Sequence, residues 1–85
     1  MAKYKIEINK KARKSLDRLS DFIVAPILGA IGDLAQNPRP QGYRKLKGRE
    51  GYRIRVGDYR VIYEIFDKVL LIEVVDLGHR KDIYD

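Results

Sequence analysis

Residues 52–65 read YRIRVGDYRVIYEI, with apolar and polar side chains alternating on both sides of Gly57-Asp58. A period of two is typical of β-strands that have one buried face. Gly57 and Asp58 form a two-residue loop of the kind that closes a tight hairpin, which sets Arg55 opposite Arg60. Opposed residues point to the same side of a sheet. One side of the predicted hairpin carries Tyr52, Ile54, Val56, Tyr59, Val61 and Tyr63, and the other side carries Arg53, Arg55 and Arg60.

The arginine side of this hairpin has two interpretations. Like charges directly opposite each other destabilise a sheet, by roughly 0.2–1 kcal/mol on the cross-strand scale, so another interaction must favour the pair Arg55 and Arg60. Guanidinium groups bind phosphate in a geometry that favours strong, charge-assisted hydrogen bonds. The alternative is a solvated outer face, because arginine is common at protein surfaces. The residues alone leave both interpretations open.

A second turn is predicted at Asp67-Lys68, followed by a strand over residues 69–76. Glu64 and Glu73 then lie on the arginine side, where a diagonal contact with either could partly neutralise Arg60. The two-residue turn predicts the cross-strand pairs Ile65–Leu70, Tyr63–Ile72 and Val61–Val74.

The first half of the chain predicts a short strand over residues 3–8 and two helices. Asn9 suits the cap of an amphipathic helix over residues 10–19, and Asp21 suits the cap of a second helix, which the sequence NPRP at 37–40 ends. Residues 43–47 predict a short edge strand. This order predicts an α+β fold, with two N-terminal helices packed on one face of a mainly antiparallel, twisted sheet.

The second helix is apolar around much of its circumference. Val24 and Leu28 fall off the main stripe of Ile23, Ile27 and Ile31, which predicts a second buried face. Either the sheet and the first helix bury this face, or it is an exposed patch that docks a protein partner.

The length of 85 residues predicts a single domain over residues 1–85, and the composition narrows its chemistry. There is no cysteine and only one histidine, which argues against disulfides, a catalytic thiol and a metal site. The net charge of +6 favours an anionic partner, nucleic acid before an acidic protein. The longest apolar run, residues 22–31, is too short to cross a bilayer, so we expect a cytoplasmic protein without membrane association.

The end of the chain holds two further candidates. His79 has the one side chain here whose ordinary pKa lies near neutrality, so it is a candidate for proton transfer, although a lone histidine more often makes an ordinary surface hydrogen bond. Tyr84 could stack on an exposed base or attach the tail to the core.

The chain resembles the RelE toxins of bacterial and archaeal toxin–antitoxin pairs over nearly its whole length. The resemblance is carried by the motifs LDRL at 16–19, NPRP at 37–40, KLKG at 45–48, YRIRVGDYRVIY at 52–63 and GHRKDIY at 78–84. It implies a RelE-like fold, related to microbial ribonucleases, and a type II toxin with a RelB-like antitoxin as its partner. It also implies a ribosome-dependent endoribonuclease without metal or cofactor. Such an enzyme cuts messenger RNA in the ribosomal A site by attack of the 2′-hydroxyl, which inhibits translation.

The resemblance also assigns residues. Arg53 and Arg55 match the basic pair on the strand, Arg60 the arginine that stabilises the transition state, and Arg80 the arginine linked to leaving-group protonation. Tyr84 matches a tyrosine that orients the base. We further expect RNA contacts from Lys45, Lys47 and Lys81, and antitoxin contacts from Val24 and Leu28.

One departure concerns the general base. RelE enzymes have lysines where this chain has Arg53 and Arg55, and arginine loses its proton far less readily than lysine. The base is then His79, a water, or no residue at all. Two other functions remain open: a ParE-like poison of DNA gyrase that cuts no RNA, and a degenerate member that only binds an antitoxin or RNA.

Overall fold

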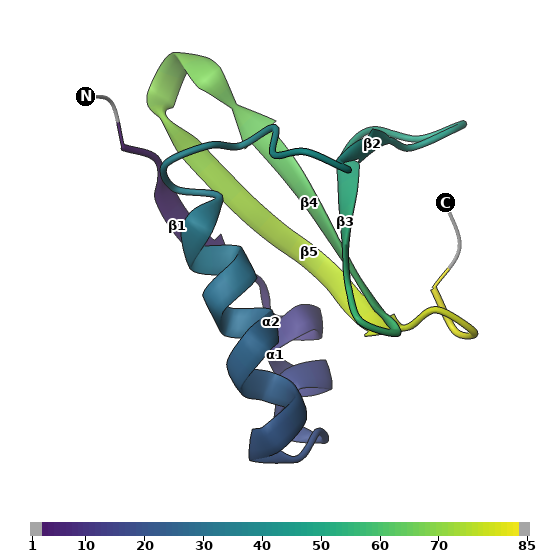
Figure 1. The fold of residues 1–85 in the computed structure, drawn as a ribbon. Helices are drawn as coiled ribbons and strands as arrows, with labels where there is room; N and C mark the ends of the chain where they lie inside the picture. Colours follow the sequence, from purple (N-terminus) through teal and green to yellow (C-terminus); the bar gives the residue numbers. More distant parts are fainter. Residues whose placement is uncertain (1–2, 84–85) are drawn as a thin grey trace.

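The computed structural model describes residues 3–83, and their strands form one five-stranded sheet in the order β1-β5-β4-β3-β2 (Figure 1). β1 is parallel to β5, and the other neighbouring strands are antiparallel. Both helices lie on one face of the sheet, so the predicted fold class is confirmed (Figure 1). The elements in chain order are β1 (Lys5–Ile8), α1 (Lys10–Asp17), α2 (Asp21–Asp33), β2 (Arg44–Lys45), β3 (Tyr52–Val56), β4 (Tyr59–Phe66), a 3-10 helix (Asp67–Val69) and β5 (Leu71–His79).

The helices begin close to where the sequence predicts. The side chain of Asn9 accepts a hydrogen bond of 2.9 Å from the backbone N–H of Ala12, which caps α1. Ser20, and not Asp21, is the cap residue of α2. Both helices end earlier than predicted, α1 at Asp17 and α2 at Asp33. The stripe from α2 reaches the core through the buried residues Ile27 and Ile31.

The hairpin of β3 and β4 has the register that the sequence predicts, with Val56 opposite Tyr59 and Arg55 opposite Arg60. Gly57 has a φ of +60°, a conformation that a two-residue hairpin loop requires and glycine adopts without strain. The side of this hairpin that faces the helices contributes Ile54, Val61 and Tyr63 to the core.

The predicted pairing of β4 with β5 is wrong by two residues. Residues 67–69 form a 3-10 helix, and Leu70 follows with a positive φ of 52°, so the connection is longer than a two-residue turn. Ile65 therefore pairs with Ile72, and Tyr63 with Val74. Because the shift is an even number of residues, Ile72 and Val74 keep their predicted core side, whereas Leu70 lies outside β5 and is 39% exposed.

A register shift then separates Ile62, which pairs with Asp76, from Tyr63, which pairs with Val74. Val75 is the extra residue of this β-bulge. The bulge brings Leu77, and not Val74, opposite Val61 on the core side. It also turns Gly78 to the same side of the sheet as Arg60.

The second face of α2 is open to solvent at Leu28, which is 45% exposed, and at Phe22, which is 90% exposed. Val24 is partly buried against the core. The sheet and α1 therefore leave Leu28 exposed and bury only part of Val24. Among the residues that the structure describes, no helix is long and apolar enough to span a membrane.

Candidate functional site

Cationic side chains gather on the side of the sheet that faces away from the helices. Arg53 and Arg55 lie on β3, and Arg44 of β2 pairs with Arg53 and so points to the same side. With Lys47 and Gly42 they line a shallow cleft of about 470 Å³. Arg53 is only 6% exposed, whereas Arg55 is exposed. The cleft thus has one guanidinium held by its surroundings and others that reach solvent.

Arg60 extends this basic surface along β4, directly opposite Arg55. Its Nη1 donates a hydrogen bond of 2.8 Å to the backbone oxygen of Ile83, in the segment that follows β5. The Ile83 side chain packs over Gly78, since a Cβ on Gly78 would lie 2.9 Å from the Cγ1 of Ile83. The segment after β5 is therefore folded back onto the arginine side of the sheet.

Arg80 is fixed beside the turn of the first hairpin. Its backbone N–H donates a hydrogen bond of 2.8 Å to the backbone oxygen of Asp58, and its Nε lies 4.0 Å from the Asp58 carboxylate. Figure 1 shows the segment after β5 leaving the sheet at this turn. The hairpin turn thus anchors the segment that carries Arg80.

Comparison with known proteins identifies the family. Residues 6–84 match the model of the ParE toxin of type II toxin–antitoxin systems. The chain is 33% identical to toxin RelG of Mycobacterium tuberculosis over 95% of both chains. Its structure superposes on the archaeal RelE–RelB complex from Pyrococcus horikoshii with a TM-score of 0.82 and 31% identity, covering 98% of this chain and 100% of the other.

The chain belongs to the RelE/ParE superfamily of type II toxins. The RelB–RelE complex from Methanococcus jannaschii is a further similar structure, with a TM-score of 0.69 and 30% identity over 93% of this chain and 95% of the other. These similarities extend along almost all of the toxin, so they include both the basic cleft and the segment after β5.

Two predicted site residues lie on the opposite side of the sheet from the arginines. His79 pairs with Tyr59, and the two rings meet edge to face at 5.5 Å on the side that the helices cover. Lys45 pairs with Tyr52 on that same side, where its Nζ donates to the backbone oxygen of Arg49 at 3.1 Å. Lys47 lines the cleft, Lys81 is exposed beside Arg80, and Tyr84 lies outside the described residues.

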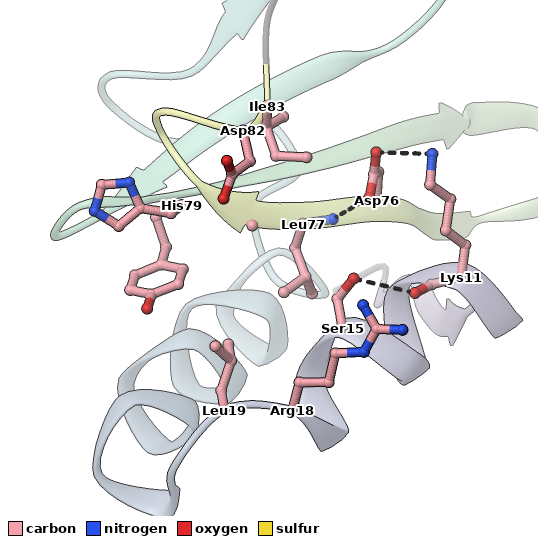
Figure 2. A pocket seen from close by; sticks show the side chains of 11 residues that line it. Lys11, Ser15, Arg18, Leu19, Asp76, Leu77, His79, Asp82 and Ile83 are labelled. Atoms are coloured by element: carbon pink, nitrogen blue, oxygen red, sulfur yellow. Dashed lines mark hydrogen bonds and ion pairs between the residues drawn. The ribbon is translucent and has the colours of Figure 1, made fainter.

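A second cleft of the toxin, of about 540 Å³, lies between α1 and the free edge of β5 (Figure 2). β1 stops where Ile8 pairs with Val74, so among residues 3–83 no strand pairs with that edge of β5 beyond this point. The Asp76 carboxylate accepts a hydrogen bond of 2.9 Å from the backbone N–H of Leu77 and lies 3.2 Å from the Nζ of Lys11. The Asp76 carboxylate thus occupies the backbone N–H of Leu77, which would otherwise be available to pair with another strand.

Sequence reasoning missed three components of the site. Arg44 could have been found, because it lies within the edge strand predicted over residues 43–47, and pairing of that strand with β3 puts it opposite Arg53. The sequence marks Asp58 only as a turn residue, although it also holds Arg80. The backbone oxygen of Ile83 carries no sequence signal at all.

Proposed function

We propose that the toxin is a ribosome-dependent endoribonuclease that cuts messenger RNA in the ribosomal A site and so inhibits translation. The observation that carries this proposal is the cleft in which Arg44, Lys47, Arg53 and Arg55 meet, with Arg60 opposite Arg55. Such a concentration of cations on one side of a sheet is costly unless an anion is bound there. The phosphodiester backbone of RNA is the anion that the net charge of +6 favours.

The proposed reaction is an in-line displacement at phosphorus. The ribose 2′-oxygen forms a bond to the adjacent phosphorus, and the bond from phosphorus to the 5′-oxygen breaks. The products are a 2′,3′-cyclic phosphate and a 5′-hydroxyl. Negative charge builds on the non-bridging oxygens during this step, and preorganised guanidinium groups stabilise it.

The arginines divide this work by position. Arg53 and Arg55 bind the phosphate, and the burial of Arg53 restricts its rotamers and so preorganises the cleft. Arg60 stabilises the transition state, and Arg80 donates a hydrogen bond to the leaving 5′-oxygen, which takes its proton from water. Tyr84 orients the base, while Lys47 and Lys81 contact the RNA backbone.

Water accepts the proton of the 2′-hydroxyl in this proposal. Arginine stays protonated in proteins, so neither Arg53 nor Arg55 is suited to take it. His79 packs against Tyr59 on the other side of the sheet, which disfavours it as the base. Catalysis then depends on charge stabilisation and on the positioning of the messenger by the ribosome.

The proposed protein partner is a RelB-like antitoxin. The similar archaeal structures are toxin–antitoxin complexes, and the exposed residues Phe22 and Leu28 offer apolar surface on α2. An amphipathic helix of the antitoxin would cover this surface, including the partly buried Val24. Acidic residues in the antitoxin would complement the toxin's charge of +6.

The test is induction of the toxin in cells, followed by primer-extension mapping of an abundant messenger. Arg60→Ala is the variant, and Arg13→Ala, an exposed arginine on α1, is the matched control. We expect cuts in register with codons for the wild type and the control, and a loss of about 10²–10³-fold for Arg60→Ala. Retained cleavage in Arg60→Ala would refute the assigned role of this arginine.

The match to a ParE family model favours one second function, a poison of DNA gyrase that cuts no RNA. The same experiment separates the two functions. Growth arrest with intact messengers would favour the gyrase poison, and normal growth would indicate a member that only binds an antitoxin or RNA.

A further inference from the structure

Residues 39–49 form a strongly basic segment of the toxin. They read RPQGYRKLKGR, which contains five cationic side chains and no acidic one, and Tyr43 is the one aromatic residue among them. Basic residues with an interposed aromatic ring are typical of surfaces that bind single-stranded nucleic acid. The proposed cleavage reaction uses Arg44 and Lys47 from this segment and leaves Tyr43 without a role.

Tyr43 is the outer end of a row of three tyrosines. Its ring centroid lies 5.8 Å from that of Tyr52, which lies 6.0 Å from that of Tyr63. Tyr63 is fully buried, and its hydroxyl donates a hydrogen bond of 2.7 Å to the backbone oxygen of Pro38. Tyr43 is 36% exposed. The buried ring of Tyr63 and the ring of Tyr52 therefore support the solvent-accessible ring of Tyr43.

Two cations flank this row. The Nζ of Lys45 lies 5.5 Å from the Tyr52 centroid, and the guanidinium of Arg39 lies 6.0 Å from it. Asp67 holds Arg39 with hydrogen bonds of 2.9 and 3.4 Å, which raise the pKa of Arg39 above its ordinary value. Asp67 neutralises the charge of Arg39 and fixes its position, so the positive charge beside the row for the phosphate of a stacked base comes from Lys45.

The tyrosine row adjoins the basic cleft across the short edge strand β2. Tyr43 contacts Tyr52 on the helix side, while the next residue, Arg44, points with Arg53 into the cleft. Gly42, on the other side of Tyr43 in sequence, also lines the cleft. A strand of RNA that leaves the cleft over this edge would therefore pass close to the ring of Tyr43.

We propose that Tyr43, at the outer end of a tyrosine row whose middle ring Lys45 and Arg39 flank, is a stacking site for one base of single-stranded RNA beside the cleavage cleft. The site gives Lys45 a role in RNA binding although it lies across the sheet from the arginines. That the ligand is RNA rests on the proposed function, but the stacking contact contributes to binding and not to the chemical step.

The test uses the full-length toxin and a short labelled RNA whose 2′-hydroxyls are replaced by 2′-O-methyl groups, so that it binds without being cut. Fluorescence anisotropy compares the wild type with Tyr43→Leu and Tyr43→Phe. Leucine keeps an apolar side chain at this position but has no ring, whereas phenylalanine keeps the ring. We expect Tyr43→Leu to weaken binding by about 5- to 100-fold, and Tyr43→Phe to bind within about twofold of the wild type.

An abasic oligonucleotide of the same length provides the control for a merely structural effect. It retains the phosphates but has no base to stack, so we expect the wild type and Tyr43→Leu to bind it equally. Equal binding of the RNA by the two proteins, equal losses on both ligands, or no binding by the wild type would each overturn the stacking site. Messenger cleavage by Tyr43→Leu in cells, measured separately, tells whether the nuclease function fails as well.

Discussion

The Nη1 of Arg60 donates a hydrogen bond of 2.8 Å to the backbone oxygen of Ile83. This contact joins Arg60, the arginine that we propose stabilises the transition state, with the segment that carries Arg80. A carbonyl oxygen here takes one of the guanidinium donors that a phosphate oxygen would otherwise use. The position of the segment after β5 and the geometry of Arg60 are therefore linked.

Gly78 sets this position, because it leaves room for the side chain of Ile83. A Cβ at Gly78 would lie 2.9 Å from the Cγ1 and 3.2 Å from the Cδ1 of Ile83, so Ile83 must move in Gly78→Ala. We expect messenger cleavage to fall by about 10- to 100-fold, since displacement of a catalytic group by about 1 Å is enough for such a loss. Single-turnover cleavage on programmed ribosomes measures it.

Gly32→Ala is the matched control, because a Cβ at Gly32 on α2 would meet nothing within 4 Å. We expect this variant to cleave like the wild type and to be more stable by about 0.5–1 kcal/mol, as alanine is the better helix former. Wild-type cleavage in Gly78→Ala would show that the segment after β5 does not position the site.

Asp58 is expected to position Arg80 through its backbone more than through its carboxylate. The side chains of the pair are largely exposed and 4.0 Å apart, and such pairs contribute about 0–1 kcal/mol. The backbone hydrogen bond of 2.8 Å from Arg80 survives any substitution of the Asp58 side chain. Asp58→Asn should therefore lower cleavage by less than about fivefold, against a far larger loss for Arg80→Ala. Equal losses in the two variants would assign the positioning to the carboxylate.

The sequence was sufficient for the first hairpin and not for the second connection. Gly57 marks the tight turn directly, and alternation then determines which side Arg53, Arg55 and Arg60 occupy. At Leu70 a positive φ is adopted by a leucine, a residue type that gives no sign of it. The 3-10 helix and the bulge at Val75 follow from packing of the whole sheet, which no local pattern records.

The site shows the same division between local pattern and tertiary contact. Strand alternation placed three arginines together, but the side that Lys45 takes depends on the register of a two-residue strand. His79 is on the far side because the bulge shifts the register of β5. Contacts made by backbone atoms, such as the oxygen of Ile83, are independent of side-chain identity and leave no trace in the sequence.

Asp67 should make stability depend on pH in the acid range. It accepts hydrogen bonds from Arg39, which is the main cause of its lowered pKa, and from the hydroxyl of Tyr4. A carboxyl group whose pKa is lower in the folded state contributes stability above its unfolded pKa and loses it as the pH falls through the folded pKa. We expect Asp67→Asn to be less stable than the wild type at neutral pH.

The difference between the two proteins should shrink as the pH falls below the ordinary carboxyl value of 3.8. Urea unfolding of both proteins across this range measures it. A difference that stays constant with pH would exclude ionisation of Asp67 as the cause.

Asp76 should stabilise the free edge of β5 mainly by capping the N–H of Leu77 and less by its ion pair with Lys11. Asp76→Ala removes both contacts and should cost about 1 kcal/mol, because an unpaired and partly buried N–H loses a net hydrogen bond. Asp76→Asn keeps an oxygen that can accept from Leu77, so it should cost only as much as Lys11→Ala, at most a few tenths of a kcal/mol for a largely exposed lysine.

Urea unfolding of the three variants distinguishes the two contacts. Equal costs for Asp76→Asn and Asp76→Ala would show that the charge, and not the cap, holds this edge. Because an uncapped edge can pair with a second chain, Asp76→Ala should also associate at lower protein concentration than Asp76→Asn, which sedimentation velocity measures. The cap thus has two separable effects, one on the unfolding equilibrium and one on self-association. If Asp76→Ala changed neither the stability nor the self-association of the toxin, the cap would have no function at this edge.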